Sequence, residues 1–198
     1  MQLISLKQIT AVVLAGGLGR RMGGLDKGLM KFRGKPMIES LLPVLEKQGV
    51  NIFINANRNQ VAYHIYGYHV IGDELEGYQG PLAGFAAVMQ MVTTPYIITL
   101  PCDGPFLAND YVQRFLTAMQ DSSEKIQVAH DGNRLQPVHA MISTNLRSSL
   151  DEYLARGQRK IDLWYQQVGY QTVNFSDCQF MFDNINRPQD LINLSRED

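Results

Sequence analysis

Residues 14–28 form the most informative segment of the chain and read Leu-Ala-Gly-Gly-Leu-Gly-Arg-Arg-Met-Gly-Gly-Leu-Asp-Lys-Gly. They follow residues 9–14, an apolar run whose β-branched and aliphatic side chains predict a buried strand. Glycine lets a backbone approach a ligand closely, and successive free N–H groups attract anions. Arg20, Arg21 and Lys27 add positive charge to the same loop. The segment therefore predicts a phosphate-binding loop after the first strand of an α/β domain, rather than a glycine-rich linker.

The loop differs from the two commonest phosphate-binding motifs. A P-loop requires a lysine that follows glycine and precedes Ser or Thr, whereas Lys27 follows Asp26 and precedes Gly28. The dinucleotide fingerprint would start at Gly17 and would need a glycine where the chain has Met22. Another class of nucleotide site is therefore expected.

Length and composition limit the remaining choices. The chain has 198 residues, which predicts a single domain over residues 1–198, because one domain typically contains about 100–200 residues. Hydrophobic residues make up 45% of the chain, enough for a substantial core. A net charge of −1 argues against nucleic acid as a partner.

The cysteines and the N-terminal sequence indicate a cellular location. Cys102 and Cys178 are far apart in sequence and lack metal-site spacing, so neither a disulfide framework nor a zinc site is expected. Residues 1–7 lack the apolar core of a signal peptide. No uninterrupted apolar run approaches the roughly 20 residues that cross a membrane. We expect a cytoplasmic protein without a membrane partner.

Strand and helix patterns alternate in the first two thirds of the chain. Apolar runs predict strands, at 9–14, 51–55, 69–71, 96–100, 126–129, 138–141, 171–175 and 182–186. Helical spacing predicts helices, at 36–48, 85–92, 108–120, 146–154 and 161–165, with Pro36 in the first turn of the helix 36–48. Such alternation favours a mostly parallel sheet whose ligands bind at the carboxyl ends of the strands.

Two carboxylates are expected at that edge of the sheet. Asp103 ends the strongly apolar strand 96–100 and lies between two prolines. A carboxylate fixed there suits Mg²⁺, which needs only one or two carboxylates in addition to phosphate oxygens. The alternative is a turn-forming Asp before Gly104. For Asp73, a ligand role and an ordinary loop role are equally compatible with the sequence.

These residues together predict phosphoryl chemistry. A nucleoside triphosphate would lie along the glycine loop, with Arg21 and Lys27 balancing its charge and Mg²⁺ on Asp103. An acceptor phosphate is already anionic at neutral pH, so its attack on the α-phosphorus needs no dedicated base. His130 and His139 are accordingly expected to be packed or hydrogen-bonded rather than catalytic.

The chain resembles the molybdenum cofactor guanylyltransferases over nearly its whole length. The resemblance rests on the glycine segment with its Gly-Gly-x-Asp-Lys-Gly ending, and on residues 54–58, 80–84, 101–103 and 182–188, in the expected order. It implies an α/β, Rossmann-like, three-layer nucleotidyltransferase fold with a mostly parallel mixed sheet. It also implies transfer of GMP from GTP to molybdopterin-bound molybdenum, with Mg²⁺ as the cofactor.

The resemblance also implies a role for individual residues. The residues that it assigns to GTP are Leu14, Ala15, Gly16, Gly17, Gly24, Lys27, Asn55, Asp73, Gly84 and Asp103. Arg21, Lys27 and Asp103 would serve catalysis, with Asp103 holding the metal. Asn184 and Asn186 would contact the pterin, so the N-terminal half would bind GTP and the C-terminal half the acceptor.

Several points remain open at this level. Gly104 stands where similar proteins often carry Thr or Met, and Asp183 where an apolar residue is common. Residue chemistry alone does not choose the base, so a molybdopterin cytidylyltransferase or a sugar-phosphate nucleotidyltransferase is the alternative within this class. A nucleotide-binding module without turnover is the alternative outside it. Instability of the cofactor suggests contact with cofactor-insertion and molybdoenzyme-maturation proteins.

Overall fold

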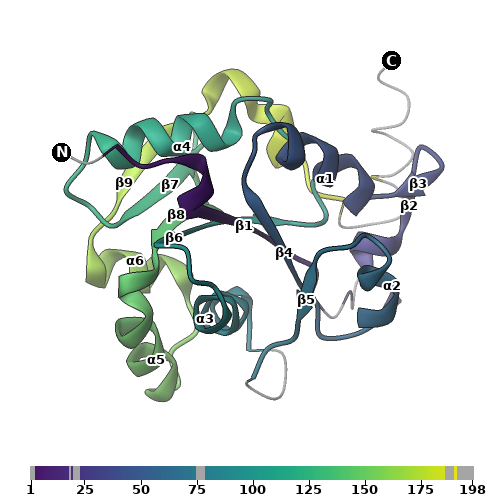
Figure 1. Ribbon diagram of the computed structural model, residues 1–198, viewed down its shortest axis with the longest axis horizontal. Coiled ribbons are helices and arrows are strands. Elements are labelled where there is room, and N and C mark those ends of the chain that lie inside the picture. The colour runs from purple at the N-terminus through teal and green to yellow at the C-terminus, as the bar shows by residue number, and fades with distance from the viewer. Residues whose placement is uncertain (1–2, 18, 20–22, 75–78, 186–189, 191–198) are drawn as a thin grey trace.

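The computed structural model describes residues 3–17, 19, 23–74, 79–185 and 190. Its centre is a seven-stranded sheet with the order β5-β4-β1-β6-β8-β7-β9 (Figure 1). The strands are β1 (Ile9–Leu14), β4 (Asn51–Asn55), β5 (His69–Ile71), β6 (Tyr96–Pro101), β7 (Ile126–His130), β8 (Leu135–Ser143) and β9 (Gln171–Asn174). All neighbouring pairs are parallel except the two that involve β8. A mostly parallel mixed sheet was predicted and is confirmed.

Helices cover both faces of this sheet. The α-helices are α1 (Ile38–Lys47), α2 (Gln60–His64), α3 (Pro81–Met91), α4 (Tyr111–Gln120), α5 (Arg147–Ala155) and α6 (Ile161–Val168). Short 3-10 helices occur at η1 (Leu6–Gln8), η3 (Lys27–Leu29), η4 (Thr144–Leu146) and η5 (Ser176–Phe182), and β2 (Lys31–Phe32) pairs with β3 (Lys35–Pro36) in a hairpin.

Two apolar cores make the arrangement a three-layer α/β structure. On one face, α1 and α4 pack against the sheet, with side chains such as Leu41 and Phe115 wholly or almost wholly buried. On the other face, α3, α5 and α6 bury side chains such as Phe85 and Trp164 (Figure 1). No helix in the described part of the chain is long and apolar enough to span a bilayer.

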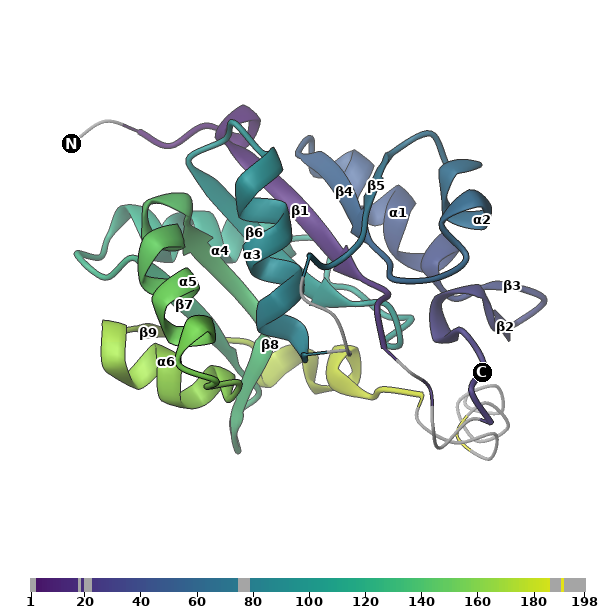
Figure 2. The same ribbon diagram turned by 90° about the horizontal axis from the view of Figure 1, so that it is seen from below.

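The strand register brings the carboxyl ends of β1, β4, β5 and β6 to one edge. Leu14, the last residue of β1, pairs with Asn55 of β4 on one side and with Pro101 of β6 on the other. Asn55 in turn pairs with Ile71 at the end of β5. Figure 2 shows the carboxyl end of β1, the amino end of α3 and the segment η5 on the same side of the molecule. The loops after these four strands therefore emerge together.

Some expected elements differ from those observed. Pro36 lies in the β2–β3 hairpin and α1 starts only at Ile38, because Lys35 and Pro36 pair with the preceding strand. The helix expected from residue 108 starts at Tyr111, and α2 was not predicted. The strand expected at 182–186 is wrong within the described residues: Phe182 ends η5, and 183–185 follow without regular structure.

Candidate active site

The glycine loop leaves β1 with backbone conformations that only glycine adopts easily. Gly19, Gly23 and Gly24 have positive φ angles of 59°, 65° and 81°. The amide of Gly24 donates to the carbonyl of Gly19 at 3.0 Å, which closes the loop on itself. The described glycines of the loop are thus joined by a backbone hydrogen bond, and phosphate binding by the loop stays a prediction. Arg21, a predicted catalytic residue, lies outside the described residues.

Lys27, a predicted phosphate-binding cation, forms an ion pair with Asp103, the predicted metal ligand. Lys27 begins η3 at the end of the glycine loop, and its Nζ lies 2.7 Å from Oδ2 of Asp103, which follows β6. The two side chains are 21% and 14% exposed, so the pair is partly shielded from water. Oδ1 of Asp103 is buried and has no hydrogen-bond partner among the described residues. The carboxylate thus keeps one oxygen for a further ligand.

A second polar cluster lies at the ends of β4 and β5. Asn55 Nδ2 donates to Oδ1 of Asp73 at 2.9 Å, and Asn57 Nδ2 donates to Oδ2 of the same carboxylate at 2.7 Å. The Asp73 amide returns a hydrogen bond to the Asn57 side chain, also at 2.7 Å. The structure therefore brings Asn55 and Asp73 together as predicted, and adds Asn57, which was not predicted as a site residue.

Two predicted glycines leave room for this cluster. A Cβ on Gly84, inside α3, would lie 2.5 Å from Oδ1 of Asn55, and a Cβ on Gly16 would lie 3.0 Å from Nδ2 of Asn57. Neither glycine has a positive φ, so close approach rather than backbone conformation favours glycine at both positions. Gly17 differs, because a Cβ there would meet nothing within 4 Å.

Leu14 and Ala15 lie between the Lys27–Asp103 pair and the Asn55–Asp73 cluster. The amide of Ala15 donates to the carbonyl of Asn55 at 2.7 Å, and the Leu14 carbonyl accepts from Cys102 at 3.1 Å. These bonds continue the ladders of β1 with β4 and β6 one residue beyond the strands. Leu14 and Ala15 therefore fix the separation between the Asn55–Asp73 cluster and the Lys27–Asp103 pair.

The predicted acceptor segment also reaches Asp103. The amide of Ile185 donates to the carbonyl of Asp103 at 2.8 Å. A Cβ on Gly104 would lie 3.1 Å from Oδ1 of Asn184, so this asparagine packs closely against the backbone next to the carboxylate. Asn184 is thus at the same edge as the glycine loop. Asn186 lies outside the described residues.

Sequence reasoning missed the residues that fasten the glycine loop. Arg58 donates to the carbonyls of Gly24, Gly17 and Leu25, and Asp26 accepts from side chains that follow β4. The segment 54–58 was noted only as part of the family resemblance. Its polar composition directly after a strand was the signal that could have marked Arg58.

The histidines expected to be structural are packed or hydrogen-bonded. Burial lowers the pKa of His139 to about 3, and its ring lies edge-on to Tyr111 and Phe182. The Tyr111 hydroxyl donates to the Thr99 carbonyl at 2.7 Å and lies 3.2 Å from Nδ1 of His139. His130 accepts a hydrogen bond from the amide of Gly132.

Cys102 fits the expected role of a small buried residue. It is 5% exposed. Burial, as the larger cause, and the negative charge of the neighbouring Asp103, as the next, raise the pKa of its thiol well above the usual value. A buried thiol with a raised pKa is a poor nucleophile. Cys102 and Cys178 are both free, as predicted.

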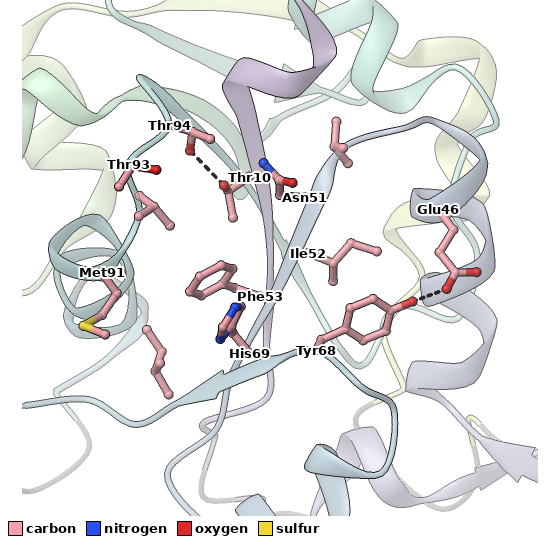
Figure 3. Close-up of a pocket in the computed structure, with 13 residues that line it drawn as sticks. Thr10, Glu46, Asn51, Ile52, Phe53, Tyr68, His69, Met91, Thr93 and Thr94 are labelled. Atoms are coloured by element: carbon pink, nitrogen blue, oxygen red, sulfur yellow. Dashed lines mark hydrogen bonds between the residues drawn. The ribbon is translucent and has the colours of Figure 1, made fainter.

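A separate cavity of about 680 Å³ lies away from these residues (Figure 3). It is lined at the amino ends of β1 and β4 by Thr10 and Asn51, and by Thr94 before β6. A hydrogen bond of 2.8 Å joins the Thr10 and Thr94 hydroxyls at its rim. The cavity therefore opens at the opposite end of the strands from the Lys27–Asp103 pair.

The donor set at the candidate site is sparse for a metal. No group of three or more His, Cys, Asp or Glu side chains that could hold an ion occurs within the described ranges. Asp103 offers one buried oxygen without a partner there and one oxygen bound to Lys27. A single hard carboxylate oxygen fits Mg²⁺, which takes its other ligands from water and phosphate, and does not fit Zn²⁺.

Comparisons with known proteins show the family of this chain. Residues 11–168 match the family model described as a MobA-like NTP transferase domain. A molybdenum cofactor guanylyltransferase from Shewanella sediminis is 44% identical over 188 residues, which cover 95% of this chain and 96% of the relative.

Solved structures show the same fold in proteins of different specificity. The molybdopterin-guanine dinucleotide biosynthesis protein A of Archaeoglobus fulgidus superposes with a TM-score of 0.78 at 20% identity, over 94% of this chain and 96% of that one. The 4-diphosphocytidyl-2C-methyl-D-erythritol synthase of Anaerococcus prevotii gives 0.74 at 12% identity, over 96% and 95%. The fold is therefore that of nucleotidyltransferases, and it does not by itself select the base.

Proposed function

We propose a function for a chain that belongs to the MobA-like NTP transferase family: it transfers GMP from GTP to molybdopterin-bound molybdenum cofactor. The products are the guanine dinucleotide cofactor and pyrophosphate. The observation that carries the proposal is the contact of 2.7 Å between Lys27 of the glycine loop and Asp103 after β6. It joins the cation that we assign to the phosphates and the carboxylate that we assign to the metal, in a chain 44% identical to a protein named for this activity.

GTP binding is assigned to the Lys27–Asp103 pair, to the Asn55–Asp73 cluster and to the backbone between them. The triphosphate lies along the glycine loop, next to Gly16, Gly17, Gly24 and Lys27. The nucleoside lies toward Asn55 and Asp73, with Leu14, Ala15 and Gly84 forming its floor. Support comes from the close approach of Gly84 to Asn55 and from the Asn55–Asp73 hydrogen bond of 2.9 Å.

Mg²⁺ is assigned to Asp103, with its remaining ligands from phosphate oxygens and water. The support is the buried Oδ1, which has no hydrogen-bond partner in the described part of the chain. When bound, the ion supplies positive charge that draws the phosphate oxygens together and favours pyrophosphate as a leaving group. Lys27 stays near by and contributes a second positive charge to the same phosphates.

The chemical step is an in-line displacement at the α-phosphorus of GTP. An oxygen of the acceptor phosphate forms the new P–O bond while the bond to the β-phosphate oxygen breaks, and pyrophosphate leaves with that electron pair. The attacking oxygen is already anionic, so the proposal requires no proton transfer from the protein. Lys27, together with Arg21, stabilises the charge on the transferred group, and the loop orients it.

The acceptor is assigned to the C-terminal half of one domain that spans residues 1–198. The support is that Asn184 lies next to Gly104 and that the Ile185 amide donates to the Asp103 carbonyl, so this segment lies beside the carboxylate that we assign to the metal. Asn186 belongs to the same assignment. Because the product cofactor is unstable, transfer through transient contact with cofactor-insertion and molybdoenzyme-maturation proteins is part of the proposal.

A pyrophosphate-release assay tests the function and its alternatives. GTP, CTP, ATP and UTP are each supplied with molybdopterin-bound molybdenum cofactor and Mg²⁺, and release is expected with GTP. Turnover with CTP alone would identify a cytidylyltransferase. Turnover only when a sugar phosphate replaces molybdopterin would identify a sugar-phosphate enzyme.

Variants of Asp103 test catalysis against simple nucleotide binding. Asp103→Ala and Asp103→Asn are expected to abolish transfer and leave the circular dichroism spectrum unchanged. Asp177→Asn is the matched control, since it removes a carboxylate paired with Arg114 on the surface, and should keep full activity. Parental rates in both Asp103 variants would show that the metal assignment is wrong. A binding module without turnover would show nucleotide affinity independent of Asp103 and of Mg²⁺.

A further inference from the structure

Arg58 lies three residues beyond β4, and its guanidinium reaches across to the glycine loop. Nη2 donates to the carbonyl of Leu25 at 2.7 Å and to that of Gly17 at 3.1 Å, while Nη1 donates to the carbonyl of Gly24. The side chain is 24% exposed. One side chain therefore binds both the start and the end of the loop.

An arginine beside a phosphate loop would ordinarily be assigned to phosphate. Here the donors of Arg58 face backbone carbonyls, in the fork geometry that only a planar guanidinium provides. We propose that Arg58 is a positioning residue that clamps the glycine loop through its carbonyl oxygens, and does not itself bind the triphosphate.

The clamp has a direct consequence for the loop amides. In a trans peptide the N–H points away from the carbonyl of the preceding residue. Arg58 binds the carbonyls of Gly24 and Leu25, so it turns the amides of Leu25 and Asp26 to the side away from the guanidinium. Gly24 has a φ of 81°, and glycine has many alternative conformations to lose. Arg58 therefore selects one of them before a ligand binds.

A second set of contacts fastens the residue that precedes Lys27. The Asp26 side chain is 5% exposed, and its carboxylate accepts hydrogen bonds from Asn59 Nδ2 at 3.0 Å and from the Tyr63 hydroxyl. Nε of Arg58 lies 3.9 Å from Oδ2 of Asp26. The end of the loop is thus fixed to α2 and the turn before it, so that Lys27 points at Asp103.

The clamp rests on the proposed binding of GTP by this loop, and its test has two independent readouts. In Arg58→Ala we expect the dissociation constant for GTP, measured by calorimetry with Mg²⁺, to rise at least about tenfold, since several charge-assisted hydrogen bonds fix the loop. Deuterium uptake of a peptide covering residues 23–29 should also rise without nucleotide. Circular dichroism should stay unchanged.

Arg58→Lys separates a clamp from a phosphate contact. Lysine keeps the charge, but its three donors radiate from one nitrogen and cannot reproduce the planar fork that reaches these three carbonyls. A clamp predicts that Arg58→Lys binds GTP as weakly as Arg58→Ala. It also predicts that added guanidinium ion at millimolar concentration restores part of the GTP affinity of Arg58→Ala.

Two control variants show whether an outcome contradicts the clamp or the proposed GTP site. Arg114→Ala removes another arginine with 24% exposure and several hydrogen bonds, and should change neither readout. Lys27→Ala tests the GTP site itself. If Lys27→Ala weakens binding while Arg58→Lys binds as the parent does, the clamp is overturned and the GTP site stands. If deuterium uptake at 23–29 rises in Arg58→Ala but neither Arg58→Ala nor Lys27→Ala alters the affinity for GTP, the proposed placement of the triphosphate along this loop is wrong instead. Unchanged uptake in Arg58→Ala overturns the clamp directly.

Discussion

Gly84→Ala perturbs the candidate site and has two effects of opposite sign on the free energy of unfolding, one from the helix and one from contact with Asn55. Gly84 lies inside α3, and the added Cβ would lie 2.5 Å from Oδ1 and 3.0 Å from Cγ of Asn55. Asn55 is 3% exposed, so its side chain has little free space into which to move. Either the amide group of Asn55 shifts or α3 moves away from β4.

The magnitudes decide the expected sign. Replacing glycine by alanine in a helix interior stabilises by about 1 kcal/mol. A displaced Asn55 loses its hydrogen bond of 2.9 Å to Asp73. Leaving such a buried polar group without its partner costs about 1–3 kcal/mol. The net change in the free energy of unfolding is therefore expected to be a loss of about 0–2 kcal/mol, the difference of these two effects.

Urea unfolding and calorimetry with GTP measure the two consequences. Because Asn55 and Asp73 are assigned to GTP, its dissociation constant should rise by about tenfold or more, corresponding to one lost hydrogen bond to a charged group. Ala86→Gly, two positions along the same helix, measures the intrinsic helix effect of α3 without contacting Asn55. Stabilisation of Gly84→Ala by about 1 kcal/mol with unchanged GTP affinity would refute the reasoning.

A double-mutant cycle isolates the steric origin. In an Asn55→Ala background the contacts with the Asn55 amide group are gone and a contact of 3.1 Å with Leu14 Cδ2 remains, so Gly84→Ala should there be less destabilising than in the parent. The difference between the two backgrounds is the interaction energy of the alanine methyl group with Asn55. An interaction energy near zero would mean that the effect of Gly84→Ala does not arise from contact with Asn55.

Three further changes are predicted. Lys27→Ala should weaken GTP binding at least about tenfold in calorimetry, since a charge-assisted contact is lost, and an unchanged dissociation constant would remove Lys27 from the phosphate site. Gly104→Thr should push Asn184 away from Asp103 and raise the KM for the acceptor, and a raised GTP dissociation constant instead would contradict this. Because burial lowers the pKa of His139 from 6.5 to about 3, the unfolded chain binds the extra proton below pH 6.5. Stability should therefore fall by about 1.4 kcal/mol per pH unit from pH 6 to pH 4, a slope that His139→Phe should remove in urea titrations.

The edge of the sheet could be predicted from the sequence because apolar strands end in polar residues. Asn55 and Asp103 follow mostly apolar runs, and parallel strands bring such endings together whatever the details of packing. The Lys27–Asp103 contact was not itself predicted, but its two partners were. Periodicity and strand endings therefore predicted which edge of the sheet carries the candidate site.

Contacts that depend on the course of loops could not be predicted in the same way. Arg58 follows a strand, as an exposed arginine often does, and only the folded loop places three carbonyls in front of it. The helix α2 is short and has one buried residue, Tyr63, so it shows no helical apolar pattern. Residues 182–186 carry a brief apolar–polar pattern that fits a strand, but the amide of Ile185 bonds to Asp103 instead of a sheet partner.

Asp103 joins the two halves of the proposed site through different groups. Its side chain binds Lys27 of the glycine loop, while its backbone carbonyl binds Ile185 of the proposed acceptor segment. The halves also share both apolar cores, since Ile9 and Val173 belong to one buried cluster and Val12 and Trp164 to the other. A division into a GTP-binding and an acceptor-binding half can therefore describe only which ligand each half contacts, because neither half has a core of its own. In the proposed site, the backbone of Asp103 contacts the acceptor side and its side chain contacts the GTP side, so we expect a shift of Asp103 to disturb the binding of both ligands at once.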